Sequence, residues 1–207
     1  MVGKWASRNN TRKSSNGAAV KAAAMIAEGG TPSVTMRELG RRLGVSRAAP
    51  YRHFEDRTAL LVAVAASGFR RLSDRLQKTL ADAPQSSLER GRRMGEEYVR
   101  FALENPAHYR LMYGKEAMAR QNLPELREAG SALFEQLVDV FQAYQESGGI
   151  KRQDPRAQAY VAWSAVHGLA SLLIDGQITP AVDVDELIRQ TTQTVLDGMR
   201  ARPPEAL

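Results

Sequence analysis

The sequence predicts an all-α protein of about nine helices. Apolar residues recur at helical spacing along most of the chain, and capping residues, glycines and prolines separate the helical segments. No segment of useful length alternates between apolar and polar residues as a half-buried strand does. The chain has no cysteine, which excludes a disulfide framework and a thiolate metal site. We therefore expect a helical fold with no cofactor and no metal.

The first predicted helix is followed by a pair of short helices joined by a sharp turn. An alanine-rich helix over residues 18–28 is closed by two glycines. Thr35 and Glu38 then have the spacing of a capping box at the start of a helix. Gly44 follows where that helix must end, and Ser46 is the expected cap of a second helix over residues 47–54. Two short helices joined by a glycine turn match the helix-turn-helix motif.

The two faces of this motif differ in chemistry. Apolar residues are expected to face inward, namely Met36, Leu39, Leu43, Val45 and Phe54. The opposite face of the second helix is small or polar, with Ser46, Arg47, Ala48, Tyr51, Arg52 and His53. A helix that enters a DNA groove needs small residues for close approach and donors for phosphates and base edges. The alternative is a helical hairpin with a solvated, charged face.

Charge is distributed unevenly and favours the DNA interpretation. Residues 1–57 hold eleven Lys and Arg against four acidic residues, a net charge of +7, so the rest of the chain carries −1 of the overall +6. Neutralising phosphates drives sequence-independent affinity for DNA, and such asymmetry is its expected footprint. Residues 1–16 are basic and contain little apolar material, which predicts a flexible arm. Incidental charge on a disordered terminus is the alternative for this arm.

The remainder is predicted to be a helical body. A long helix is expected over residues 57–81 with Asp56 as its cap, and Ser86 with Glu89 opens a helix that reaches Asn105. Further helices are expected from Pro106 to Gly114, from Pro124 to Gly148, from Asp154 to Asp175, and from Asp183 to a point before Pro203, with a loop over 115–123. We therefore expect an arm over 1–16, a head over 17–62, a body over 63–202 and a tail over 203–207.

The motif and the body together resemble the tetracycline-repressor (TetR) family of regulators. The stretch from Val45 to Phe54, followed by Arg57, carries the resemblance, which covers about residues 18–65. The body is similar to the branch of the family marked by a Trp-His-Gly signature, which here is Trp163, His167 and Gly168. The resemblance implies a homodimer that binds a palindromic double-stranded DNA operator, usually as a repressor released by a small-molecule effector.

The resemblance also implies roles for individual residues. Thr35, Tyr51, His53 and Arg57 would hold phosphates, and Ser46 would lie near the DNA backbone. Base edges would be read by Arg47 and Ala48, and Arg52 belongs to the same interface. One departure is Pro50, where many relatives carry an aliphatic residue. Proline removes the first helical hydrogen bond after the Ser46 cap, so the recognition helix is expected to start late or irregularly.

The body offers candidates for a largely apolar effector site. They are Tyr98, Phe101, Met112, Tyr113, Phe134, Val138, Trp163 and His167. Pockets are mostly apolar with a few polar anchors, and His167 would be such an anchor. The alternative is that these residues are ordinary core.

The last two long helices, about 155–175 and 184–200, suit dimerisation. Their stripes of small and apolar residues are Tyr160, Ser164, His167, Ser171 and Ile174, with Leu187, Thr191, Thr194 and Val195. Small residues let helices approach closely, so paired helices would form a four-helix interface. Packing within one chain is the alternative.

Other function classes fit less well. The three histidines are far apart in sequence, and no nucleophile elbow, P-loop or dinucleotide-binding glycine motif is present. We therefore do not expect an enzyme. An architectural DNA binder without ligand control would need only the head. No segment is long and apolar enough to predict a membrane span, and a cytoplasmic location is the simplest expectation.

Overall fold

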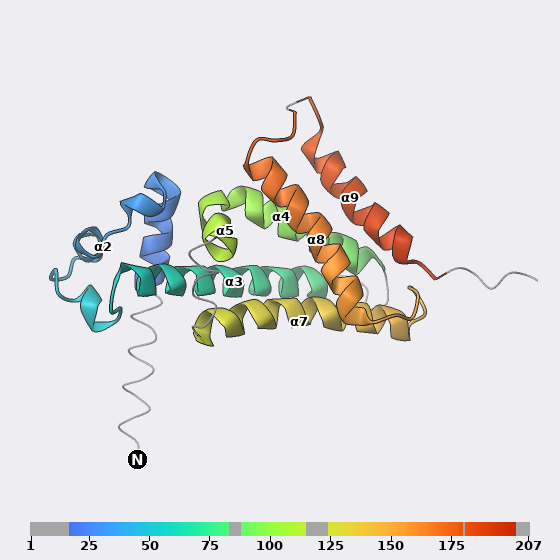
Figure 1. The fold of residues 1–207 in the computed structure, drawn as a ribbon, viewed down its shortest axis with the longest axis horizontal. Helices are drawn as coiled ribbons and strands as arrows, with labels where there is room; N and C mark the ends of the chain where they lie inside the picture. Colours follow the sequence, from blue (N-terminus) through green and yellow to red (C-terminus); the bar gives the residue numbers. More distant parts are fainter. Residues whose placement is uncertain (1–16, 83–87, 115–123, 180, 202–207) are drawn as a thin grey trace, which may run out of the picture. The chain divides into compact units, whose positions relative to one another are not determined.

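The computed structural model describes residues 17–82, 88–114, 124–179 and 181–201 (Figure 1). Within these ranges the regular elements are helical, apart from one isolated bridge between Ile150 and Arg200. The all-α prediction is confirmed. The predicted arm over 1–16, the cap at Ser86, the loop over 115–123 and the tail over 203–207 lie outside the described residues.

The helices follow the predicted order. A first helix covers residues 17–29, and the others are η1 (Thr31–Ser33), α2 (Met36–Leu43), η2 (Pro50–Arg52), α3 (Arg57–Ala81), α4 (Leu88–Glu104), α5 (Pro106–Tyr113), α7 (Pro124–Glu146), α8 (Pro155–Ile174) and α9 (Val184–Met199). The elements labelled η are short 3₁₀ turns.

Local capping explains why most boundaries match the prediction. At the start of α2, α3, α8 and α9, a side-chain oxygen of the residue before the helix accepts a hydrogen bond from a first-turn backbone N–H. The accepting residues are Thr35, Asp56, Asp154 and Asp183 respectively. Gly44 ends α2 with φ 68°, a left-handed conformation that glycine adopts without strain. These signals are local, so the sequence alone contains them.

The chain divides into two compact units. The first comprises residues 1–70 and 105–130, and the second comprises residues 71–104 and 131–207. Helices α3 and α7 each contribute residues to both units.

Within the first unit, α5 approaches α3 at a glycine. A Cβ added at Gly68 would lie 2.6 Å from the sulfur of Met112 and 3.0 Å from a ring carbon of His108. Nε2 of the buried His108 lies 2.8 Å from the backbone oxygen of Val64, a hydrogen-bonding distance. The bare glycine surface therefore lets a methionine and a histidine of α5 pack directly on the backbone of α3.

Within the second unit, α4, α8 and α9 pack on one another, and Figure 1 shows α8 and α9 side by side. A Cβ added at Gly95 of α4 would lie 2.7 Å from a methyl carbon of Thr192 on α9. Gly91, one turn earlier, donates its backbone N–H to the hydroxyl of Tyr144 on α7. Burial raises the pKa of Tyr144 to about 12, so the phenol stays neutral. Two glycines of α4 thus create the space that its neighbours fill.

Candidate functional site

The segment after Gly44 departs from the predicted recognition helix. The N–H of Ala49 donates to the Ser46 carbonyl at 3.0 Å in a turn, and only Pro50–Arg52 form a 3₁₀ helix. The cap of that helix is Ala49, with no side-chain capping bond, so the prediction of a Ser46 cap and an α-helix over 47–54 is wrong. Pro50 has no N–H to donate to the Ser46 carbonyl, which removes the bond that would start a regular helix.

A glycine of α2 holds this irregular segment in place. A Cβ added at Gly40 would lie 3.3 Å from the Ser46 carbonyl oxygen and 3.5 Å from Cγ of Pro50. Pro50 and Phe54 are buried, so they anchor the segment beneath its exposed side chains. Gly40 is not among the residues predicted from the sequence to be functional. Its signal was a glycine inside an otherwise helical pattern, which often marks close packing.

The predicted DNA contacts, with one exception, lie on an exposed surface. We call it the head surface, and it consists of Thr35, Ser46, Arg47, Ala48, Tyr51, Arg52 and His53. Leu43 and Val45 are exposed as well, at 37% and 45%, so the prediction that they face inward is wrong. They flank the left-handed turn at Gly44, where α2 ends.

Two arginines of α2 are already paired. The Glu38 carboxylate accepts two hydrogen bonds from Arg41, at 2.8 and 2.6 Å, and one from Arg42 at 2.9 Å. These bonds, chiefly those from Arg41, lower the pKa of Glu38 to about 2. Arg42 also pairs with Glu28 at 2.5 Å. Glu38 therefore binds arginines rather than completing the predicted capping box, in which only the Thr35 half forms.

The exception among the predicted DNA contacts is Arg57. Its Nε donates to the Val34 carbonyl at 2.8 Å, and its Nη2 donates to the Thr31 carbonyl at 2.7 Å. The side chain is half-buried, and both bonds end on the protein backbone. The structure thus gives this guanidinium acceptors within the fold.

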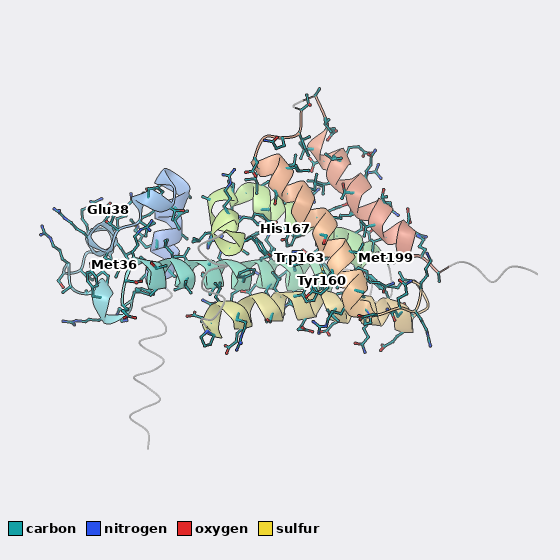
Figure 2. All side chains as sticks on the ribbon, in the orientation of Figure 1. Met36, Glu38, Tyr160, Trp163, His167 and Met199 are labelled. Carbon is teal, nitrogen blue, oxygen red and sulfur yellow. The ribbon has the colours of Figure 1, made fainter. Side chains whose placement is uncertain are left out.

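A second candidate site lies in the second unit. Nε1 of Trp163 donates to the Tyr98 hydroxyl at 3.0 Å, and that hydroxyl lies 3.1 Å from Nδ1 of His167. The Phe134 ring lies 5.9 Å from Trp163 and 4.4 Å from Tyr160, measured between centroids. Figure 2 shows Tyr160, Trp163 and His167 following one another along α8. We call these five residues the aromatic row.

The electrostatics of the aromatic row favour a neutral histidine. Burial lowers the pKa of His167, so its imidazole is uncharged at neutral pH. The Tyr98 hydroxyl oxygen accepts the Trp163 N–H, and the same hydroxyl shares a hydrogen bond with Nδ1 of the neutral imidazole. Arg156 lies 5.7 Å from the centre of the Phe134 ring and pairs with Glu135 at 2.8 Å, so its charge is balanced.

The other predicted effector residues lie elsewhere. Phe101 and Val138 are buried in the second unit. Met112 and Tyr113 belong to the first unit, where Met112 packs at Gly68 and the Tyr113 ring lies 5.2 Å from Phe69. The aromatic row therefore contains four of the predicted effector residues, together with Tyr160, which was predicted to belong to the dimerisation stripe.

One side of α8 is apolar and exposed. We call Val161, Ser164, Gly168 and Leu172 the α8 face; Val161 and Leu172 are 57% and 48% exposed. A Cβ added at Gly168 would meet nothing within 4 Å from other parts of the described chain, the adjacent backbone of α8 aside. This face shares only Ser164 with the predicted stripe on the same helix. Among the described residues, α8 is also the one helix whose length and composition would allow it to cross a membrane, and 22% of its most apolar window is buried.

The described residues contain no candidate metal site of the usual kind. No group of three or more His, Cys, Asp or Glu side chains there is arranged to hold a metal ion.

Similarity to known proteins identifies the family. Residues 20–64 match the model of bacterial regulatory proteins of the tetR family. Residues 92–195, half of the chain, match the model of the tetracyclin repressor-like C-terminal domain. The protein belongs to the TetR family. It is accordingly a DNA-binding transcriptional regulator with a helix-turn-helix head.

Solved structures agree with this assignment. A protein of unknown function from Rhodococcus sp. RHA1 is 33% identical over 89% of this chain and 94% of its own, with a TM-score of 0.81. A TetR-family regulator from Pectobacterium atrosepticum is 21% identical over 95% and 99%, with a TM-score of 0.73. The TetR-family regulator PfmR from Thermus thermophilus is 21% identical over 89% and 99%, with a TM-score of 0.66. The last two structures, at 21% identity, show that this chain has the same fold as those regulators. No protein of curated function matches the chain.

Proposed function

We propose that this TetR-family protein is a cytoplasmic homodimer that represses transcription from a palindromic operator and is released by a small, largely apolar ligand. The observation that carries the DNA part is the head surface. It presents the exposed side chains of Arg47, Tyr51 and Arg52 around a short turn that Pro50 and Phe54 anchor from below. Arginine donors and small neighbours are what reading base edges in a major groove requires.

Few positive charges of the head are unpaired and therefore available for DNA. Arg41 and Arg42 are paired with Glu38, whereas Arg37, Arg47 and Arg52 are exposed and have no ion pair among the described residues. We therefore assign phosphate and base contacts to these three arginines, with Thr35, Ser46, Ala48, Tyr51 and His53 as small or polar partners. Affinity should accordingly be salt-dependent.

The experiment selects an operator from random DNA with the wild-type protein and then measures its dissociation constant at several salt concentrations. We expect Arg47→Ala to weaken binding by about 10- to 100-fold, from the loss of one base contact. Arg152→Ala removes one exposed charge between α7 and α8 and serves as the matched control. The DNA assignment would be wrong if wild type selects no sequence, or if both variants bind alike.

Dimerisation is supported by the α8 face. Residues 157–174 contain no charged side chain, and the exposed Val161 and Leu172 flank the open space at Gly168. A second copy of the chain would cover this surface. Lipid is the poorer partner because the charged Arg156 lies in the first turn of the helix and the buried Gln158 bonds to the Lys151 carbonyl. Two heads in one dimer would meet two half-sites about 34 Å apart.

The dimer has a direct test in sedimentation. We expect wild type to sediment as two chains of 22.8 kDa at micromolar concentration. Leu172→Arg should produce a folded monomer, since Leu172 is 48% exposed within one chain. Val20→Arg is the control, because Val20 is 56% exposed on the first helix. A monomeric wild type would contradict the proposal.

The aromatic row supports an uncharged effector. Its polar atoms are joined in the chain from Trp163 through Tyr98 to His167, and the lowered pKa of His167 leaves no cation there for a carboxylate. The rings of Phe134 and Tyr160 add apolar surface. A ligand that is mostly hydrocarbon with one or two hydrogen-bonding groups fits this chemistry.

Fluorescence can test the effector site. In a Trp5→Phe background Trp163 is the remaining indole. Uncharged aromatic and aliphatic alcohols or ketones should shift its emission and release the operator, whereas matched carboxylates should do neither. His167→Phe should abolish both responses. Operator release without a change at Trp163 would place the effector elsewhere.

A further inference from the structure

The side chain of Arg57 joins the start of α3 to the turn that precedes the helix-turn-helix. Its two donors, Nε and Nη2, reach the carbonyls of Val34 and Thr31 at 2.8 and 2.7 Å. These carbonyls belong to η1 and the residue that ends it. The next residue, Thr35, caps α2. The planar guanidinium has donors in a fixed fork, which suits two acceptors at a set spacing.

The same turn is held from its other side. The Ser33 hydroxyl lies 2.8 Å from the Met25 carbonyl and 2.7 Å from the Gly30 carbonyl, so the first helix fixes one edge. Val34 is fully buried between these contacts. Arg57 supplies the corresponding bonds from α3. The position at which α2 begins is therefore determined by hydrogen bonds from two helices.

We propose that Arg57 is a positioning residue for DNA reading and not a phosphate ligand. It fixes how α2, and the η2 segment packed on α2 at Gly40, are presented to DNA. This inference rests on the proposed operator binding, because the geometry it fixes is that of the head surface. Its guanidinium is oriented by the protein before DNA arrives.

Lysine and arginine distinguish the two roles. Arg57→Lys keeps the positive charge at this position but replaces the fork with a single ammonium, which cannot reproduce both bonds in the same geometry. Arg57→Gln removes the charge as well. For a phosphate ligand, Lys should function almost as well as Arg, and Gln should reduce the salt slope by about one unit. For a positioning residue, both variants should fail in the same way.

The experiment compares wild type, Arg57→Lys and Arg57→Gln on the operator and on random DNA. We expect both variants to lose at least about 10-fold in operator affinity, with Arg57→Lys binding random DNA as wild type does and keeping its salt slope. Equal losses on operator and random DNA by Arg57→Lys would indicate general destabilisation and overturn the proposal. Near wild-type operator affinity of Arg57→Lys would also overturn it.

Hydrogen exchange in the free protein provides a readout without DNA. The amides of Glu38 and Leu39 bond to the hydroxyl and the carbonyl of Thr35 at 3.1 and 2.9 Å, so they report the first turn of α2. We expect both amides to exchange faster in Arg57→Lys than in wild type, while amides in the middle of α3 stay protected. Unchanged exchange would overturn the positioning role. If wild type selects no operator, the proposed function fails, and the exchange result still decides whether Arg57 holds the turn.

Discussion

The head surface and the α8 face are both exposed, but they differ in charge and in backbone regularity. The head surface carries Arg47 and Arg52 around a turn with only three residues of 3₁₀ helix. The α8 face carries Val161, Gly168 and Leu172 on a regular helix whose residues 157–174 hold no charge. Exposure alone therefore does not identify a partner. Charge on an irregular backbone suits a nucleic acid, and a smooth apolar helix suits another protein surface.

The largest effect is expected from adding volume to the α8 face. A Cβ at Gly168 has open space among the described residues, so Gly168→Leu should not lower the melting temperature of the monomer. If a second copy packs closely there, overpacking should weaken the dimer by about 10- to 100-fold and the operator affinity with it. Sedimentation and operator binding measure this. Gly17→Leu is the control, because Gly17 also faces open space. Equal behaviour of the two variants would move the interface away from α8.

The next effect concerns the backbone of the head surface. Pro50→Ala restores an N–H that can donate to the Ser46 carbonyl, so the recognition segment should become more regular and Arg47 should shift. We expect the preferred operator to change, with discrimination at the affected base pair altered by about 10-fold. Pro124→Ala, at the first position of α7, is the control. Operator selection measures the preference; an unchanged operator would mean that the irregular turn does not set specificity.

A smaller effect is expected from the paired arginines. Glu38→Gln removes the ion-pair partner of Arg41, while Arg42 keeps Glu28, so affinity for random DNA should rise a few-fold and its salt slope should steepen by about one unit. Glu128→Gln, exposed on α7, controls for the loss of one negative charge. Titrations with random DNA at several salt concentrations test this. Indistinguishable slopes would show that the arginines contact DNA despite Glu38, or not at all.

The pH dependence of Glu38 has a defined sign. Its folded pKa, about 2, lies below the ordinary value of 4.5. Its stabilising contribution is therefore complete above about pH 4.5 and is lost as the pH falls towards 2. In wild type the melting temperature should fall across this window, and in Glu38→Gln the fall should be smaller. Parallel curves for the two proteins would contradict the pairing.

The smallest effect is expected in the aromatic row. The folded pKa of His167 lies below its ordinary value of 6.5 because burial disfavours the charged imidazole. The neutral group contributes fully above about pH 6.5, and stability is lost as the pH falls through the folded pKa. His167→Asn should flatten this part of the melting-temperature curve. A curve unaffected by His167→Asn would contradict the neutral assignment.

The sequence predicts elements whose signals are local. Asp154 followed by Pro155 predicts the start of α8, and Asp56 predicts the start of α3, because each cap acts within its own first turn. The departure at Pro50 was also predictable in kind, since proline lacks the donor that a regular helix needs. The residues of the head surface could also be expected to be exposed from the sequence alone, because most of them are polar or small.

Contacts between distant segments were not predictable in this way. Arg57 bonds to carbonyls 23 and 26 residues earlier, and no local pattern indicates those partners. Met112 and Tyr113 have the composition of pocket residues, but their contacts lie with α3 in the first unit. The packing role of Gly40 could not be predicted without knowing that the segment at Pro50 folds back onto α2. Side-chain type limits which interactions a residue can make, and tertiary packing decides which neighbour it makes them with.

The bond between Gly91 and Tyr144 has a consequence for the order of folding. Gly91 lies in the first turn of α4, and its N–H donates to a hydroxyl 53 residues further along the chain. During synthesis the start of α4 therefore leaves the ribosome well before the hydroxyl that completes it. Closing so long a loop also costs chain entropy before the contact can stabilise the fold. The N–H of Gly91 should thus gain this acceptor only when α7 docks, which makes its protection a marker for the docking of α7 in the second unit.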